Sequence, residues 1–299
     1  MRKGLRNIRP VYQKETMSSS RTARLTVIVL AFNLVLALVG LVQLQLMVKN
    51  SSYYGEMSYS SLLEMYTMVA SFEAAFILFI VPALTAGSIS GERERQTLDL
   101  LLCTRLRPLD IIVGKLLSSL STVFVLMVSS LPVLALVFIY GGIGLWDLGI
   151  LFFCLGVAAL FAGSVSIFFS SWMKRTTMAT VLSYLAVIFM VAGTYLVLVL
   201  IYNIISLMTP STVRFDTRIM NLFNLLLLLN PAMTFYSLFN GQMGAGTEMN
   251  FMSWYNSYIM TDRLLEPWWV WASCLLQLAL SVLFIWLAGR AICPLRRKS

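Results

Sequence analysis

The sequence predicts an all-α membrane protein with six transmembrane helices, folded as a single transmembrane domain over residues 1–299. Three observations lead to this fold class. Hydrophobic residues make up 59% of the chain and charged residues only 12%, about half the charged fraction of a soluble domain. Six apolar runs are long enough to cross a bilayer, which takes about 20 residues. Basic residues are concentrated in alternate connections between these runs.

The six runs give the approximate positions of the expected spans. They are residues 25–48, 67–89, 111–140, 148–173, 177–207 and 267–292. The third and fifth runs are longer than a bilayer requires, so we expect them to tilt or to extend beyond it. In the fourth run, Gly156 and Gly163 predict close packing of one helix against another, because small residues let helix backbones approach.

The distribution of basic residues orients these spans. Eighteen of the 22 lie before the first span, between the second and third, between the fourth and fifth, or after the sixth. Connections that face the cytoplasm carry such an excess. We therefore expect a multi-pass protein of the cell (cytoplasmic) membrane with both termini in the cytoplasm and residues 208–266 as an external loop. The net charge of +9 is thus a sign of topology rather than of nucleic-acid binding.

One segment of the external loop, residues 219–239, is apolar enough to span the membrane. A seventh span would place the basic C-terminus outside, against the charge distribution. We interpret the segment as a re-entrant or interfacial helix broken near Asn230-Pro231, and the choice between the two stays open. Irregular backbone at such a break has to be buried in protein or wetted.

Several function classes are excluded by missing residues. The chain contains no histidine, which removes Ser-His-Asp and Cys-His catalysis and the commonest zinc and haem ligand. The four cysteines show no repeated spacing, as a disulfide framework or metal site would. No G-x-x-x-x-G-K-[S/T] motif for binding ATP is present. We therefore expect a chain that is not an enzyme and binds no cofactor itself.

The connection between the second and third spans, residues 90–107, is the most distinctive segment. Ser90 can cap a helix, and Glu92 and Glu94 would then lie in its first turn, where the helix dipole favours negative charge. A leucine stripe follows, and Pro108 ends the helix. The stripe consists of Leu98, Leu101 and Leu102. Such an element can dock into a groove on a soluble partner, whereas the alternative is a solvated loop that only separates two spans.

Glu73 is the clearest ionisable residue at membrane depth. A charge there costs about 2.5 kcal/mol or more unless it is paired or wetted. One interpretation is a carboxylate that lines a cavity and contacts a cationic substrate or carries a proton. The other is a carboxyl that is protonated or bonded to a neighbouring helix, and the sequence favours neither.

The order of residues from Glu92 resembles the permease subunits of ABC type-two exporters. The pattern is acid-Arg-Glu-x-x-Thr-Leu-x-Leu-Leu-Leu, followed by a basic stretch and then Gly114-Lys115-Leu116-Leu117. A Pro-x-x-x-x-Glu run beginning at Pro10 and the Asn230-Pro231 pair also recur in that family. One position departs from the family: glycine is frequent before the threonine, and here the residue is Gln96. This difference is not expected to alter docking.

The resemblance implies a fold and a set of partners. Residues 10–22 would form an interfacial helix, and residues 90–107 would contain the coupling helix that seats in an ATPase subunit. The coupling residues would be Glu92, Arg93, Glu94, Arg95, Thr97, Leu98, Leu101 and Leu102. Two ATPase subunits would hold ATP and magnesium, and a second permease, identical or homologous, would complete the pathway. The alternative is a stand-alone secondary transporter or channel with Glu73 as its intramembrane ionisable site.

Overall fold

The computed structural model describes residues 23–54, 59–98, 103, 108–139, 143–208, 225–243 and 267–292. Every regular element in these ranges is a helix, so the predicted all-α class is confirmed there. The expected interfacial helix at 10–22 lies outside the described residues. The elements are α2 (Ala23–Tyr54), α3 (Tyr59–Thr85), α4 (Gly87–Glu94), α6 (Pro108–Ile139), α7 (Leu145–Trp172), α8 (Thr176–Ile188), the π-helical turn η1 (Phe189–Gly193), α9 (Thr194–Met208), the 3-10 helix η2 (Leu225–Leu229), α11 (Pro231–Met243) and α13 (Pro267–Ile292).

Six helical stretches of the described chain are long and apolar enough to cross a membrane, as the sequence predicts. They are Leu25–Lys49, Leu62–Glu94, Pro108–Ala135, Leu145–Trp172, Thr176–Ile201 and Trp268–Ile292. The second stretch continues past the predicted end at residue 89, because α4 follows α3 after a one-residue turn at Ala86. Its 33 residues would extend about 50 Å, more than the ~30 Å of a hydrocarbon core, so its end reaches beyond the bilayer.

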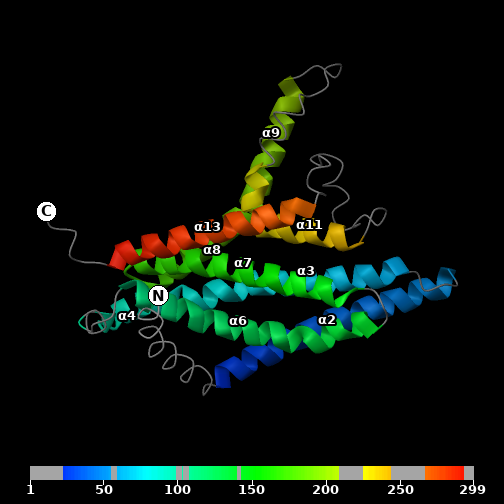
Figure 1. The fold of residues 1–299 in the computed structure, drawn as a ribbon, viewed down its shortest axis with the longest axis horizontal. Helices are drawn as coiled ribbons and strands as arrows, with labels where there is room; N and C mark the ends of the chain where they lie inside the picture. The colour runs from blue at the N-terminus through cyan, green and yellow to red at the C-terminus, as the bar shows by residue number, and fades with distance from the viewer. Residues whose placement is uncertain are drawn as a thin grey trace.

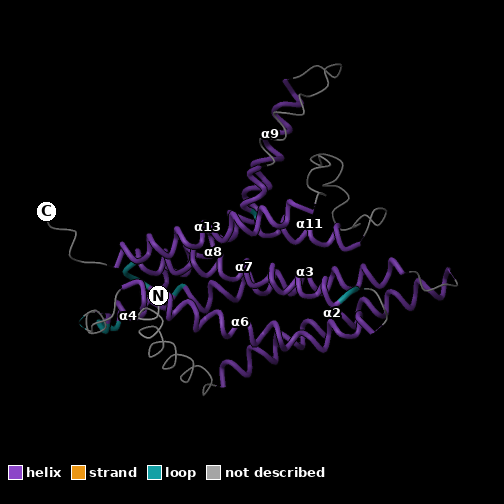
Figure 2. The backbone as a smooth tube through the Cα atoms, viewed as in Figure 1, coloured by secondary structure: helices purple, strands orange, loops and turns teal. Residues whose placement is uncertain are grey.

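Helix α7 forms the centre of the bundle. It packs against α13, α8, α3 and α6, and its residues are buried along most of its length. Figure 1 shows these helices lying lengthwise beside one another, with α2 along one side. The backbone tube in Figure 2 shows only helices and short loops in the described part of the chain.

The glycines of α7 differ in what they contribute to this packing. A Cβ atom at Gly163 would lie 2.9 Å from Cδ1 of Leu116 in α6 and 3.4 Å from Cγ1 of Val81 in α3. The prediction of close helix packing is therefore confirmed at Gly163, where two other helices approach the α7 backbone. At Gly156 no atom lies within 4 Å of the corresponding point, so the prediction is wrong for that residue.

The fifth predicted run is divided by the π-helical turn η1. Helix α8 lies along the bundle, whereas α9 points away from it (Figure 1). Near the start of α9, Leu198 is buried against a small cluster that contains Leu227 of η2 and Trp269 of α13. Leu200, Ile204 and Leu207 further along α9 are exposed in the single chain. The long run in the sequence is thus two helical segments that point in different directions.

Asn230 lies at the helix break that the sequence predicts, between η2 and α11. Its side-chain oxygen accepts a hydrogen bond from the Ala232 amide at 2.9 Å, which caps α11, and Pro231 occupies the first helical position. Its side-chain nitrogen donates to the Val191 carbonyl oxygen at 2.8 Å and to Thr194 Oγ1 at 2.9 Å. The Asn-Pro pair therefore starts α11 and ties it to the π-helical turn. Helix α11 continues to Met243, beyond the predicted end of the segment at residue 239.

Candidate coupling site

The helix that carries the acid-Arg-acid motif is α4, and its start differs from the prediction. The sequence suggests that Ser90 caps this helix, but α4 begins at Gly87 and Ser90 lies inside it. The Ile89 and Ser90 amides each donate to Ser170 Oγ of α7 at 3.0 Å. An acceptor from a neighbouring helix thus serves the first turn of α4 in place of a local cap.

Helix α4 also ends earlier than predicted. Gln96 has a φ of 57°, in the left-handed region, directly after the helix. The Gln96 amide donates to the Arg93 carbonyl at 3.1 Å, and the Thr97 amide donates to the Glu92 carbonyl at 2.9 Å. This pair of bonds is the Schellman arrangement that ends many helices. Glycine suits that position because it lacks a Cβ, which gives a physical reason for the family's preference for glycine where this chain has Gln96.

Leu98 lies beyond this turn, and its side chain points into the protein. It is only 7% exposed and packs in a cluster with Ile89 of α4, Leu116 of α6 and Ile167 of α7. The single helix predicted from Ser90 to the leucine stripe is therefore interrupted between α4 and Leu98. Leu101 and Leu102 lie outside the described residues.

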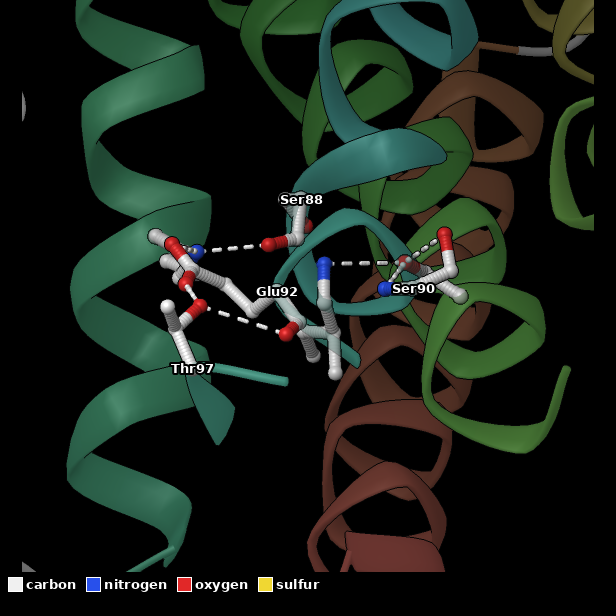
Figure 3. Close-up of polar contacts among 7 residues, drawn as sticks. Ser88, Ser90, Glu92 and Thr97 are labelled. Atoms are coloured by element: carbon white, nitrogen blue, oxygen red, sulfur yellow. Dashed lines mark hydrogen bonds and ion pairs between the residues drawn. The ribbon is translucent and has the colours of Figure 1, made fainter. Parts of the chain in front are cut away.

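Glu92 is held by two other residues. Lys115 Nζ of α6 lies 3.3 Å from Glu92 Oε1 and also donates to the Ser88 carbonyl oxygen at 2.5 Å. Thr97 Oγ1 donates to the second carboxylate oxygen of Glu92. Figure 3 shows Glu92 between Ser88 and Thr97, with dashed lines marking these contacts. Because Lys115 is almost completely buried, its positive charge needs this carboxylate as a partner. The two parts of the motif, at Glu92 and at Lys115, therefore meet in space.

Arg93 binds the carboxyl end of α7. Its Nη1 donates to the Met173 carbonyl oxygen at 3.1 Å, and its Nη2 donates to the Ser171 carbonyl oxygen at 3.0 Å. The last carbonyl groups of a helix lack partners within the helix and carry a partial negative charge. A guanidinium group meets both needs, so Arg93 fixes the end of α7 to α4.

Glu94 binds the amino end of the next helix, α8. Its Oε1 accepts a hydrogen bond from the Thr176 amide at 2.9 Å, and its Oε2 accepts one from Thr176 Oγ1 at 2.8 Å. The amino end of a helix carries unpaired N–H groups and a partial positive charge, which a carboxylate complements. Adjacent residues of opposite charge therefore hold the opposite ends of two consecutive helices. The turn between α7 and α8, residues 173–175, is thereby bound to α4.

The outward face of this region is polar in the described residues. Glu94 at the end of α4 and Arg95 and Gln96 directly after it are exposed, and Lys174 and Arg175 are exposed in the α7–α8 turn. Figure 1 shows α4 at the same end of the bundle as the last residues of α13. Sequence reasoning selected Glu92, Arg93 and Glu94 but did not predict their partners, because all of these except Thr97 lie more than 20 residues away in other parts of the bundle. The sequence placed Glu92 and Glu94 in the first turn of a helix, whereas both lie in the last turn of α4.

Glu73 lies elsewhere, at the contact between α3 and α6. Its side chain is fully buried, and its Oε1 lies 2.6 Å from Ser130 Oγ. Glu92 lies nineteen positions further along the chain, which corresponds to roughly 30 Å at the rise of a helix. The structure therefore does not bring Glu73 together with the residues of the coupling motif. Among the described residues, no group of three or more His, Cys, Asp or Glu is placed to hold a metal ion.

The sequence matches the model of a family described as "ABC-2 family transporter protein" over residues 9–289. A comparison with curated proteins found no match. The family match covers nearly the whole chain, including five of the apolar helices, most of the sixth and the motif around α4. The chain therefore belongs to the ABC-2 transporter family, as a multi-pass membrane permease.

Proposed function

We propose that this permease is the membrane-spanning subunit of an ABC exporter and forms half of the translocation pathway. Two separate ATPase subunits bind and hydrolyse ATP with magnesium, and a second permease, identical or homologous, forms the other half. The family supports a permease role, and the chain contains no Walker A motif of its own. In this proposal the ATPase subunits supply the energy for transport.

The proposed point of coupling is the end of the bundle that carries α4. The observation that carries this proposal is that consecutive residues Glu92, Arg93 and Glu94 join α4 to α6, α7 and α8. A partner that pushes on the loop after α4 would therefore move three helices together. In this proposal Leu98 anchors the loop to the bundle, and Leu101 and Leu102 contact the ATPase. Arg95 and Thr97 complete the turn, with Arg95 exposed toward the partner.

The orientation proposed for the chain follows from charge. The basic residues of the described turns, Arg95, Lys174 and Arg175, lie at the α4 end of the bundle, as do Arg93 in the last turn of α4 and Arg290 in the last turn of α13. This is the distribution expected of a cytoplasmic face. Both termini and the ATPase subunits would then lie on that side of the cell membrane.

The alternative, a stand-alone carrier or channel built around Glu73, receives little support from the described residues. Carriers of this kind place ionisable side chains at broken helices near the bilayer midplane. Glu73 instead lies within the continuous helix α3 and is closed off by α6. We therefore keep the ABC permease as the proposed function.

Site-specific crosslinking to the ATPase subunit tests the proposal. Gln96→Cys carries an exposed thiol at the α4 end, and Trp146→Cys carries one at the start of α7, at the opposite end. Both are made with Cys103 and Cys293 replaced by serine, and a maleimide photocrosslinker is attached. We expect a covalent adduct with the co-purified ATPase from Gln96→Cys and none from Trp146→Cys. An ATPase that binds the permease but reacts with neither position, or equally with both, would contradict the coupling role.

A further inference from the structure

Two adjacent serines of α6 make the same backbone contact in the middle of the bundle. Ser129 Oγ lies 2.7 Å from the Leu126 carbonyl oxygen, and Ser130 Oγ lies 2.7 Å from the Met127 carbonyl oxygen. In each case the hydroxyl can donate its hydrogen to the carbonyl three residues earlier. A hydroxyl group has only one hydrogen, so a further contact to the same oxygen requires a donor on the other side.

At Ser129 the second contact follows this rule. Asn33 Nδ2 of α2 donates to Ser129 Oγ at 2.9 Å. The amide is a donor, the hydroxyl accepts from it, and the hydroxyl hydrogen remains available for the Leu126 carbonyl. Helix α2 is thereby hydrogen-bonded to α6 without any unsatisfied hydrogen.

At Ser130 the second contact is Glu73 Oε1 of α3, at 2.6 Å. Both contacts of Ser130 are satisfied when Glu73 is a carboxylic acid that donates its hydrogen to Ser130 Oγ. The Ser130 hydrogen then remains available for the Met127 carbonyl. If Glu73 were ionised, both Glu73 and the Met127 carbonyl would compete for the single hydrogen of Ser130. The ionised form would also leave a fully buried charge with one hydrogen bond, which is strongly unfavourable in a membrane-spanning bundle.

In the part of the chain that the structure describes, Glu73 forms no ion pair that would offset such a charge. The second carboxyl oxygen of Glu73 has no hydrogen-bond partner, which a neutral carbonyl oxygen tolerates far better than a carboxylate oxygen does. The nearest titratable group on the same helix is Tyr66, two turns away, and its hydroxyl donates to Gln242 Oε1 at 3.0 Å. The buried lysine of the described chain, Lys115, pairs with Glu92 instead.

We propose that Glu73 is a proton-binding site in the core of the bundle, held as a neutral carboxylic acid that donates a hydrogen bond to Ser130. The ligand of this site is a proton, and the residue is not an anionic contact for a cationic substrate. Because the acid lies between α3 and α6, the proton can exchange with water only when these helices separate. This inference concerns the permease alone and does not depend on the ATPase subunits.

Infrared difference spectroscopy of the full-length permease in lipid nanodiscs tests the assignment. The carbonyl stretch of a protonated carboxylic acid is separated from the amide and carboxylate bands. At neutral pH we expect the wild type to show this band and Glu73→Gln to lack it. Glu64→Gln is the matched control, because Glu64 lies on the same helix with an exposed side chain, and the band should remain.

Ser130→Ala provides a second readout that a purely structural role would not change. Removal of the acceptor leaves the acid without its hydrogen bond, so the band should move to higher frequency while keeping its intensity. Glu73→Gln should retain the wild-type melting temperature, because an amide N–H can donate to Ser130 Oγ from the same place. Absence of the band at neutral pH, its survival in Glu73→Gln, or an unchanged frequency in Ser130→Ala would each overturn the proposal.

Discussion

At the scale of single residues, the end of α4 shows how one position can depart from a family pattern without changing the backbone. Gln96 occupies the left-handed conformation that glycine adopts without steric cost. The Schellman hydrogen bonds of Gln96 and Thr97 and the contact between Thr97 and Glu92 hold the turn despite the side chain at Gln96. These bonds keep the turn in its conformation, although the left-handed backbone of Gln96 costs some stability.

Gln96→Gly should therefore stabilise the permease. Removing the Cβ relieves roughly 1–2 kcal/mol of left-handed strain, and the added flexibility of the unfolded chain returns part of that gain, which leaves about 0.5–1 kcal/mol. Arg95→Gly is the matched control, because Arg95 has a φ of −80° and should only lose stability. Thermal unfolding in a single detergent provides the measurement. A lower melting temperature for Gln96→Gly would show that the side chain of Gln96 contributes more than its backbone strain costs.

The residue scale also shows what sequence reasoning can identify. Glu73 and the acid-Arg-acid motif stood out because charged residues are rare in this chain. Their partners could not be predicted, since Ser130 and Thr176 look ordinary in the sequence, and nothing pairs Lys115 with Glu92 until the helices are placed together. Cys154 and Cys274 illustrate the same limit, because they are 120 residues apart in sequence yet their sulfur atoms lie 3.8 Å from each other.

At the scale of elements, α4 fixes the turn between α7 and α8 by hydrogen bonds to both helices. Arg93 holds the carbonyl groups at the end of α7, while Glu94 holds the amide at the start of α8. Helix boundaries near such contacts are hard to predict from sequence, because hydrogen-bond acceptors on other helices, such as Ser170, replace local caps. The apolar runs themselves were predicted well, since bilayer thickness alone determines their minimum length.

Arg93→Ala should loosen the α7–α8 turn. The variant loses two charge-assisted hydrogen bonds, and an equilibrium shift of about 1.5 kcal/mol corresponds to on the order of a tenfold increase in local opening. Trypsin should then cleave after Lys174 or Arg175 correspondingly faster, as measured by mass spectrometry of digested membrane vesicles. Arg95→Ala removes a neighbouring exposed charge and serves as the control, with cleavage at the wild-type rate. Equal cleavage of the two variants would argue that Arg93 does not hold this turn.

At the scale of the whole molecule, the fold is a bundle with one central helix and one segment that leaves it. The number of spans could be predicted from composition and length, but the direction of α9 could not. Its residues are as apolar as those of any span, and the change of direction arises at a π-helical turn fixed by Asn230 from a distant part of the chain. The pattern of apolar residues in the sequence does not reveal that tertiary contact.

The proposed topology makes a prediction for the whole chain. Cys103 is exposed in the loop after α4, so a membrane-impermeant maleimide should label it only from the cytoplasmic side. A thiol at Trp146→Cys, at the other end of α7, should react only from outside. Comparing intact cells with inside-out vesicles gives the measurement. Labelling of Cys103 in intact cells would reverse the proposed orientation and remove the α4 end from reach of an ATPase.

The π-helical turn at Phe189–Gly193 has a consequence for how the chain can vary in length. A π turn holds one residue more than an α turn, so it behaves as a single-residue insertion into an otherwise regular helix. Deleting one residue there would restore the ordinary repeat, rotate everything that follows by about 100° and join α8 and α9 into one straight rod. The Val191 carbonyl would then be taken up by the helix, and Asn230 would lose one of its two acceptors.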